Sequence, residues 1–298
     1  MGNESLLSKL DNHTISYLKQ KKLLNSSINT ILTYKNILNS FYEYILDLKD
    51  IDVLKDINRE VILNFVNQDE KSANSTKILY LTVIKSFFIY IDEIENLNGF
   101  FELLFKKLTI KKDSVEVEAL NEVEISKLLS RLEKRLTSFN KNRDALLIKI
   151  ILFTGIRASE MLNIQLSDLT LLEDKKVYKI KILGKGDKER FVYIAENKIS
   201  NELNFLLSQH YLTDYLAITN RKKRMTRVGL YNVISNKMKK ALIDKKGVHI
   251  LRHTFARQLV AKNINLSTIS ELLGHASITL TATTYAKSNE ESKIRAIL

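Results

Sequence analysis

The sequence predicts a mainly α-helical protein of two domains, with a small β-hairpin or sheet in the second domain. At about 150 residues per domain, a chain of 298 residues corresponds to two domains. The chain has no proline and only eight glycines, so few residues interrupt helices. Hydrophobic residues make up 45% and charged residues 27%, a balance that supplies enough apolar material for a packed core.

The composition also excludes several classes of protein. The chain has no cysteine, which rules out a disulfide scaffold and any cysteine-ligated zinc site. It has no run of 18 apolar residues, and its first 20 residues lack the apolar core of a secretory signal. We therefore expect a cytoplasmic protein that does not cross a membrane.

The positive charge lies almost entirely in the second part of the chain. Residues 1–112 hold 15 basic and 14 acidic side chains, whereas residues 113–298 hold 32 and 20. Such an excess either keeps the protein soluble or binds a polyanion such as nucleic acid. The run RKKRMTR offers phosphate contacts, with a solvated basic loop as the alternative; its basic residues are Arg221, Lys222, Lys223, Arg224 and Arg227.

The first domain, residues 1–108, is predicted to be a small helical bundle. Apolar residues recur at helical spacing in three segments: 26–48, 74–91 and, more weakly, 58–67. Ser26 or Ser27 is the expected N-cap of the first segment, and Asn74 or Ser75 that of the second. Because each helix has one apolar face, the helices need one another to bury it.

A linker is predicted at 109–118, where the sequence is charged and lacks an amphipathic period. The second domain, residues 119–298, starts with a helix capped by Asn121 and continues with an apolar helix at 141–153 that Thr154-Gly155 ends. Apolar residues on both sides of Gly184-Lys185-Gly186 indicate a β-hairpin. The remaining helices are predicted at 158–164, 196–209, 227–242 (capped by Thr226), 250–262 and 266–273.

Three stretches place unusual polar residues in apolar surroundings: TGIRASE at 154–160, HILRHTFA at 249–256 and LLGHASITLTATTYAK at 272–287. Arg157 follows a buried-looking helix and a glycine, a place where a ligand can approach the backbone. Its alternative role is an ion pair with Glu160, three residues later.

His249 and Arg252 lie three residues apart, so they share one face of a helix and combine a proton donor with a bidentate phosphate binder. His253 follows, and its neighbours favour a partly buried structural role. A zinc site on His249 and His253 is disfavoured, because the HExxH pattern is missing and two ligands are too few. No metal site is predicted.

Three further residues have an ordinary alternative beside the functional one. Lys185, at the tip of the predicted hairpin, is either a solvated turn residue or a group that reaches a phosphate. Gly274 is a plausible helix C-cap, directly before His275. Tyr285 follows ten residues after His275, and most tyrosines serve only in packing; the chain has twelve.

Taken together, TGIRASE, LGKGDKER, HILRHTFA and LGH…Tyr occur in the order found in the tyrosine recombinase (phage integrase) family, which the chain resembles over nearly its whole length. Within this family it looks most like the Xer-like site-specific recombinases. The first domain is similar to the family's helical, SAM-like core-binding domain, and the second to its catalytic domain.

The resemblance implies a catalytic set on matching positions: Arg157, Lys185, His249, Arg252, His275 and the nucleophile Tyr285, with Glu160 in support. Arg190, in LGKGDKER, is included among the expected DNA contacts. The two arginines and His275 would bind the phosphate, Tyr285 would attack it to form a 3′-phosphotyrosine, and Lys185 would protonate the leaving oxygen. His249 would help to move the tyrosine proton.

Two departures from the family pattern stand out. Val248 occupies the position before His249, where the family often has proline. Tyr285 lies ten positions after His275, where the family usually has nine, and one extra residue in a helix would rotate the tyrosine by about 100°. We expect a loop at 276–284 to absorb this rotation.

The resemblance further implies strand exchange through a Holliday junction, without a metal, ATP or another cofactor. The expected partners are double-stranded DNA with a specific site and a homo-tetramer, or a hetero-tetramer with a second recombinase, with a DNA translocase as a possible helper. The tail 286–298 either docks on a neighbouring protomer or frays. The role is Xer-like resolution of chromosome or plasmid dimers, or integration and excision of a mobile element.

Two alternatives stay open. A type IB topoisomerase-like enzyme would share the chemistry but relax supercoils without paired sites. A non-catalytic DNA-binding protein on the same fold would grip DNA without forming a covalent bond.

Overall fold

The structure is a computed structural model that describes residues 5–48, 50–113, 117–134, 137–184, 188–208, 214–275 and 277–285. The chain divides into two compact units, Met1–Val115 and Glu116–Leu298, and the division falls within the predicted linker at 109–118. Each unit has its own hydrophobic core. The prediction of a mainly helical chain with a small sheet in the second unit is confirmed.

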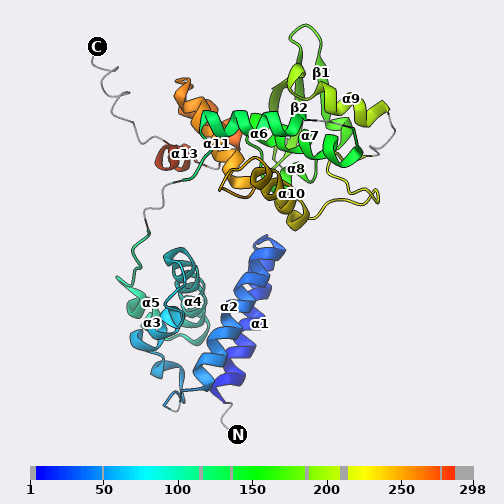
Figure 1. Ribbon diagram of the computed structural model, residues 1–298. Helices are drawn as coiled ribbons and strands as arrows, with labels where there is room; N and C mark the ends of the chain where they lie inside the picture. Colours follow the sequence, from blue (N-terminus) through cyan, green and yellow to red (C-terminus); the bar gives the residue numbers. More distant parts are fainter. Residues whose placement is uncertain are drawn as a thin grey trace, which may run out of the picture. The chain divides into compact units, whose positions relative to one another are not determined.

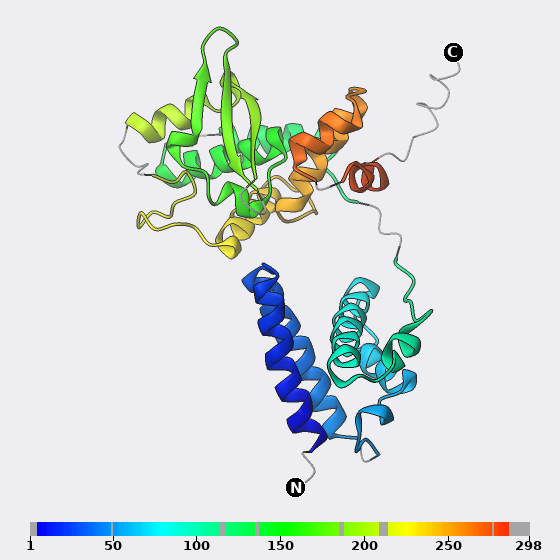
Figure 2. The same cartoon turned by 180° about the vertical axis from the view of Figure 1, so that it is seen from behind.

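The first unit is a helical bundle around an aromatic core. Its helices are α1 (Leu6–Leu23), α2 (Ile28–Leu46), α3 (Arg59–Asn67), α4 (Asn74–Glu95) and α5 (Phe100–Phe105), with a short 3₁₀ turn at Leu54–Asp56. Helices α1 and α2 lie side by side and run in opposite directions (Figures 1 and 2). Phe41, Phe65, Phe87, Phe88 and Phe101 are fully buried and stack edge to face or tilted against one another.

Helices α2, α3 and α4 confirm the three segments predicted in this unit, and Ser27 caps α2 as expected. The predicted cap of α4 is wrong, because the helix already begins at Asn74 and its N-cap is Ala73, which makes no side-chain hydrogen bond. Helix α1 was not predicted, since its buried face has only one apolar or small residue per turn in an otherwise polar segment.

The second unit is built around α7 (Phe139–Thr154), which is buried on every side along residues 142–152. A helix with no exposed face lies at the centre of a core. Helices α6 (Glu122–Glu133), α9 (Ser200–Ser208), α10 (Arg227–Lys240) and α11 (Val248–Ala261) pack against it. The capping box of Asn121 and Glu124 starts α6, and Thr226 caps α10, as predicted.

The sheet of this unit is antiparallel in the order β1 (Leu169–Leu172), β2 (Val177–Leu183) and β3 (Glu189–Ala195) (Figure 2). Strands β2 and β3 form the predicted hairpin, with Ile180 opposite Val192. The inward side chains Ile180, Ile182, Val192 and Ile194 are buried in the same core as α7. Strand β1 was not predicted, because its four residues are too few to show an alternating pattern.

Three further short α-helices are described in this unit: α8 (Ala158–Met161), α12 (Leu266–Leu273) and α13 (Ile278–Tyr285). Helix α12 packs against α13, and α8 against α10. The expectation of a loop at 276–284 is wrong, because residues from Ile278 onward are helical and the extra residue lies on or before α13. Across the described residues, no helix has both the length and the apolar character needed to cross a bilayer.

Gly155 ends α7 in the left-handed conformation, with φ of 66°. A Cβ atom built there would clash with the ring of Phe255 and lie 2.9 Å from Leu273 Cδ2. Gly155 therefore lets α7, α11 and α12 meet at the place where the TGIRASE segment leaves α7.

We predict that Gly155→Ala destabilises the second unit by roughly 1–2 kcal/mol for the left-handed backbone and a further ~1–3 kcal/mol for the clash. Gly99 is the matched control, because its φ is 74° but a Cβ would meet nothing closer than 3.8 Å. Hydrogen exchange in increasing urea measures the free energy of unfolding of each unit separately. Equal losses for the two variants would contradict the packing argument.

Candidate active site

Arg157 is held at the N-cap of α8, directly after the left-handed turn at Gly155. Its Nη1 donates to Glu160 Oε1 at 2.8 Å, and its Nη2 donates to the Gly274 carbonyl at 2.7 Å. The ion pair weighed as an alternative role for Arg157 is thus present. The side chain is nevertheless 35% exposed, so the guanidinium keeps a face toward solvent.

Arg252 reaches the same turn from α11. Its Nη1 donates to the Gly155 carbonyl at 2.7 Å and its Nη2 to the Leu273 carbonyl at 2.8 Å. The two arginines therefore bind consecutive carbonyls, those of Leu273 and Gly274, at the C-terminus of α12. Carbonyl groups at a helix end carry partial negative charge, which lets two guanidiniums approach each other.

Glu160 is the buried carboxylate of the site, with a side chain only 4% exposed. Its Oε1 accepts from Arg157 and from Arg190 Nη1, and its Oε2 accepts from Arg190 Nη2 and the Arg157 backbone N–H, all at 2.7–2.8 Å. Burial alone would raise the pKa of Glu160, but the hydrogen bonds and charges of Arg190 and Arg157 outweigh burial and lower it. Glu160 is therefore ionised at neutral pH.

The charges gathered here favour an anionic ligand. Arg157, Arg190 and Arg252 bring three positive charges to the turn, while Glu160, the carboxylate bonded to two of them, brings one negative charge. Guanidinium N–H groups match the geometry of phosphate oxygens. The arrangement can bind a phosphodiester and stabilise the extra charge that develops on it during displacement.

His275 follows the turn directly, and its Nδ1 lies 2.8 Å from Oγ1 of the fully buried Thr281 on α13. Burial lowers the pKa of His275 to about 4, with contributions in decreasing order from Arg252, Arg157, His253 and Arg190. At neutral pH the ring is therefore uncharged. When the Thr281 hydroxyl donates to Nδ1, the ring N–H is on Nε2, where it can donate to a phosphate oxygen.

His249 and His253 lie on the first turns of α11, with ring centroids 6.3 Å apart. Burial, followed by Arg227, Arg252 and Arg157, lowers the pKa of His249, so it is neutral and able to accept a proton at pH 7. His253 is partly buried, as predicted, and burial is the largest cause that lowers its pKa to about 4. Among the residues that the structure describes, no three potential metal ligands cluster together.

Two members of the predicted catalytic set fall outside what the structure describes. Lys185 lies between the end of β2 and the start of β3 and is outside the described residues. Tyr285 is the last residue of α13, one helical turn beyond Thr281, and the structure describes its backbone but not its side chain. The tail at 286–298, with its expected docking, is also outside the described residues.

The predicted DNA contacts separate into two groups. The basic side chains of the run at 221–227 are exposed, whereas Met225 between them is buried. Arg224 also donates to Asn163 Oδ1 and to the Leu162 carbonyl and lies over the Tyr215 ring. Arg190 differs, because its side chain is 15% exposed and its guanidinium is directed into Glu160. A DNA contact for the basic residues of the run stays a prediction.

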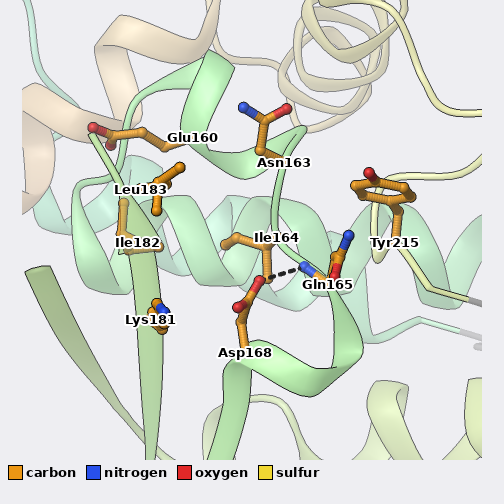
Figure 3. A pocket seen from close by; sticks show the side chains of 9 residues that line it. All are labelled: Glu160, Asn163, Ile164, Gln165, Asp168, Lys181, Ile182, Leu183 and Tyr215. Carbon is orange, nitrogen blue, oxygen red and sulfur yellow. Dashed lines mark hydrogen bonds between the residues drawn. The ribbon is translucent and has the colours of Figure 1, made fainter. Parts of the chain in front are cut away.

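A shallow pocket lies beside the site, between strand β2 and the segment that follows α8 (Figure 3). Asp168 accepts from the Gln165 backbone N–H at 2.8 Å within it, and Tyr215 stands at the opposite side. The Glu160 carboxylate points away from both of them in Figure 3. The carboxylate that accepts from Arg157 and Arg190 is therefore directed away from Asp168 and Tyr215.

Comparison with known proteins identifies the family. Residues 118–292 match the family model described as "Phage integrase family". The chain belongs to this family. The Campylobacter jejuni protein named tyrosine recombinase XerH is 31% identical over 268 residues, which cover 87% of this chain and 75% of the relative.

Solved structures agree with this family. XerH bound to a palindromic difH substrate in a post-cleavage complex is 29% identical, with a TM-score of 0.80 over 95% of this chain and 84% of that one. A lambda integrase tetramer bound to a Holliday junction shares the fold at 17% identity, with a TM-score of 0.69 over 93% of this chain and 79% of that one. The chain is thus a tyrosine recombinase, an enzyme that cleaves and rejoins DNA.

Three features of the site were not found from the sequence. Thr281 sits among other threonines and nothing in its spacing distinguishes it. The carbonyls of Leu273 and Gly274 accept hydrogen bonds from Arg252 and Arg157. The only sequence signal for free carbonyls at this place is the predicted helix C-cap at Gly274. The partners of Arg190 come from segments 30 and 82 residues away.

We predict that Thr281→Val loosens α13, because His275 Nδ1 loses its hydrogen bond while the side-chain shape is kept. A neutral hydrogen bond contributes about 1 kcal/mol, roughly fivefold in the local opening equilibrium. Hydrogen exchange of the α13 amides should rise by about this factor in Thr281→Val and return in Thr281→Ser. Thr279→Val, at an exposed position of the same helix, is the control. Unchanged exchange in Thr281→Val would contradict the role of this bond.

A second prediction concerns how the stability of the second unit depends on pH. His253 and His275 have pKa values of about 4 in the fold against an ordinary value of 6.5, so between these values the unfolded chain binds more protons. The free energy of unfolding of the second unit should therefore be largest above pH 6.5 and fall as the pH decreases toward 4. Urea unfolding at several pH values measures this loss, which His253→Gln should reduce. A wild-type profile that is flat over this range would be inconsistent with neutral, buried histidines.

Proposed function

We propose that this recombinase breaks a DNA strand at the phosphate held between Arg157 and Arg252, with Tyr285 as the nucleophile. The observation that supports this most strongly is the convergence of the two guanidiniums on consecutive carbonyls directly before His275. Positive charge and a neutral N–H donor then face the same non-bridging oxygens. Such preorganised donors stabilise the transition state more than the ground state.

In the first step the Tyr285 oxygen attacks the phosphorus and the bond from phosphorus to the 5′ oxygen breaks. The products are a 3′-phosphotyrosine and a free 5′-hydroxyl. His249, which is neutral and adjacent to Arg252, accepts the phenolic proton, and Lys185 gives a proton to the leaving oxygen. Arg157, Arg252 and His275 hold the pentacoordinate phosphorus throughout.

In the second step a 5′-hydroxyl from another strand attacks the phosphotyrosine and Tyr285 leaves. One phosphoester bond is made for each one broken, so the sequence of steps balances without ATP. Both steps use the same donors, because the charge develops on the same oxygens in each direction. Resealing to the original strand restores the substrate, whereas resealing to a partner duplex yields a Holliday junction.

The assembly we propose is a tetramer on two duplexes. Full exchange breaks four strands, and each protomer supplies one Tyr285, so four protomers are needed. The four are copies of this chain, or this chain together with a second recombinase. The exposed basic run at 221–227 would bind the DNA backbone, with an affinity that falls as salt rises. The first unit would grip the duplex as the core-binding domain.

The biological role we propose is Xer-like resolution of chromosome or plasmid dimers, since relatives named XerH, XerD and XerC match over most of the chain. Integration and excision of a mobile element is the second possibility. A DNA translocase partner would be expected only for chromosome dimers.

The experiment starts with selection of bound duplexes from a fragmented genomic pool. The enriched site is then rebuilt with a nick close to the cleaved bond, so that the short 5′-hydroxyl fragment diffuses away and the covalent complex accumulates. We predict a covalent protein–DNA band with the wild type and none with Tyr285→Phe, while Tyr193→Phe, an exposed tyrosine on β3, behaves like the wild type.

The other outcomes separate the alternatives. Sequence-selective binding without a covalent band would indicate a non-catalytic DNA-binding protein. A covalent band with relaxation of supercoiled plasmids that lack the selected site would indicate a topoisomerase-like enzyme. Recombination between two copies of the selected site in one plasmid supports the proposal directly.

A further inference from the structure

Arg190 lies at the start of β3, opposite Ile182 of β2 in the hairpin that carries Lys185. It is one of the basic residues expected to bind DNA, but its side chain turns inward and is only 15% exposed. The hydrogen bonds described for its side chain are all made within the second unit, to Glu160 on α8 and to Leu272 at the end of α12.

All three nitrogen atoms of the Arg190 guanidinium donate hydrogen bonds. Nη1 and Nη2 donate to the two oxygens of Glu160, each at 2.8 Å, and Nε donates to the Leu272 carbonyl at 3.2 Å. The group also packs flat on the chain at Gly274, where a Cβ atom would lie 2.9 Å from Arg190 Cζ. Glycine at 274 therefore makes room for Arg190 as well as forming the left-handed turn.

These contacts bear on the geometry of Arg157. The Arg157 guanidinium is fixed by two groups, Glu160 and the Gly274 carbonyl. Arg190 bonds to the first of them and packs beside the Cα of the residue that supplies the second. The same turn continues into His275, and its carbonyl at Leu273 holds Arg252. Arg190 thus connects the β2–β3 hairpin with the anchors of three members of the predicted catalytic set.

We propose that Arg190 is a positioning residue for strand cleavage: its paired hydrogen bonds to Glu160 and its packing on the Leu272–Gly274 turn keep Arg157 and His275 in register with the hairpin. This inference rests on the proposed function, since it concerns the same site. It replaces the expected DNA contact of Arg190 with a role inside the domain.

Arginine suits this position for a physical reason. A planar fork binds both oxygens of one carboxylate and still has Nε free for a carbonyl, whereas the ammonium of lysine is a point charge that cannot span these acceptors. Without Arg190, the buried Glu160 keeps only its bonds to Arg157, and a buried carboxylate that has lost a partner draws the remaining one into a new geometry. Arg157 is that remaining partner.

The kinetic test separates positioning from DNA binding. With the selected nicked duplex, we expect Arg190→Lys and Arg190→Gln to slow single-turnover cleavage at saturating protein by about tenfold or more, because small displacements of positioning groups carry large rate penalties. The dissociation constant for the duplex should stay within about twofold, with an unchanged salt dependence. Arg131→Gln, at an exposed arginine of α6, is the matched control and should change neither quantity.

The opposite pattern would overturn the proposal. If Arg190 binds DNA, its variants weaken binding and reduce the salt dependence, while cleavage at saturation proceeds at the wild-type rate. A double variant adds a second check. In a Glu160→Gln background, Arg190→Gln should slow cleavage by less than about threefold, because the two residues act as one unit. Full additivity would contradict this coupling.

A measurement on the free protein keeps the inference independent of catalysis. The amides of Gly274 and His275 donate to the Glu271 and Ser270 carbonyls. Their hydrogen exchange should rise several-fold in Arg190→Gln and stay unchanged in Arg131→Gln. Equal protection in wild type and Arg190→Gln would refute the positioning role. Absence of a covalent complex with the wild type would instead refute the proposed function, while this exchange result would still decide the role of Arg190.

Discussion

The ion pairs of Glu160 connect the parts of the active site. This carboxylate is buried, and it accepts from Arg157 and Arg190, which come from different elements and from positions 33 residues apart. A buried negative charge is unfavourable unless it is fully paired, so the surrounding groups are strongly constrained to their places. The short helix α8, the β2–β3 hairpin and the end of α12 all meet at this point.

The backbone around this carboxylate is shaped to bring the two arginines together. Gly155 and Gly274 both adopt positive φ, and each offers a carbonyl to a guanidinium of the predicted catalytic set. Side chains at these positions would collide with Phe255 and Leu273 in one case and with Arg190 in the other. The two turns therefore serve packing and charge placement together, and the resulting excess of positive charge matches a phosphate.

Much of this could be predicted from the sequence because it depends on local chemistry. The α7 helix shows a long apolar run, the caps Ser27, Asn121 and Thr226 stand before amphipathic segments, and the hairpin strands alternate around glycines. Motif order pointed to the arginines and histidines. The wrong cap on α4 and the unpredicted α1 belong to segments where polar residues conceal the helix boundary or its buried face.

The remaining features depend on contacts that exist only in the folded structure, which no local pattern records. Arg190 is a basic residue in a lysine-rich hairpin segment, which suggested a DNA contact. Only the folded structure shows that its side chain is directed into Glu160. Thr281 is one of several threonines in its segment, and its bond to His275 requires that α13 be a helix and not a loop.

We propose that Arg157 acts by neutralising negative charge on a phosphate bound between it and Arg252. The most direct measurement compares cleavage of the selected duplex carrying either a phosphate or a neutral methylphosphonate at the reactive position. On the phosphate, Arg157→Ala should be slower than the wild type by a factor of about a hundred or more. On the methylphosphonate, which lacks the negative oxygen, this deficit should shrink by at least about tenfold. An equal deficit on both linkages would contradict the account.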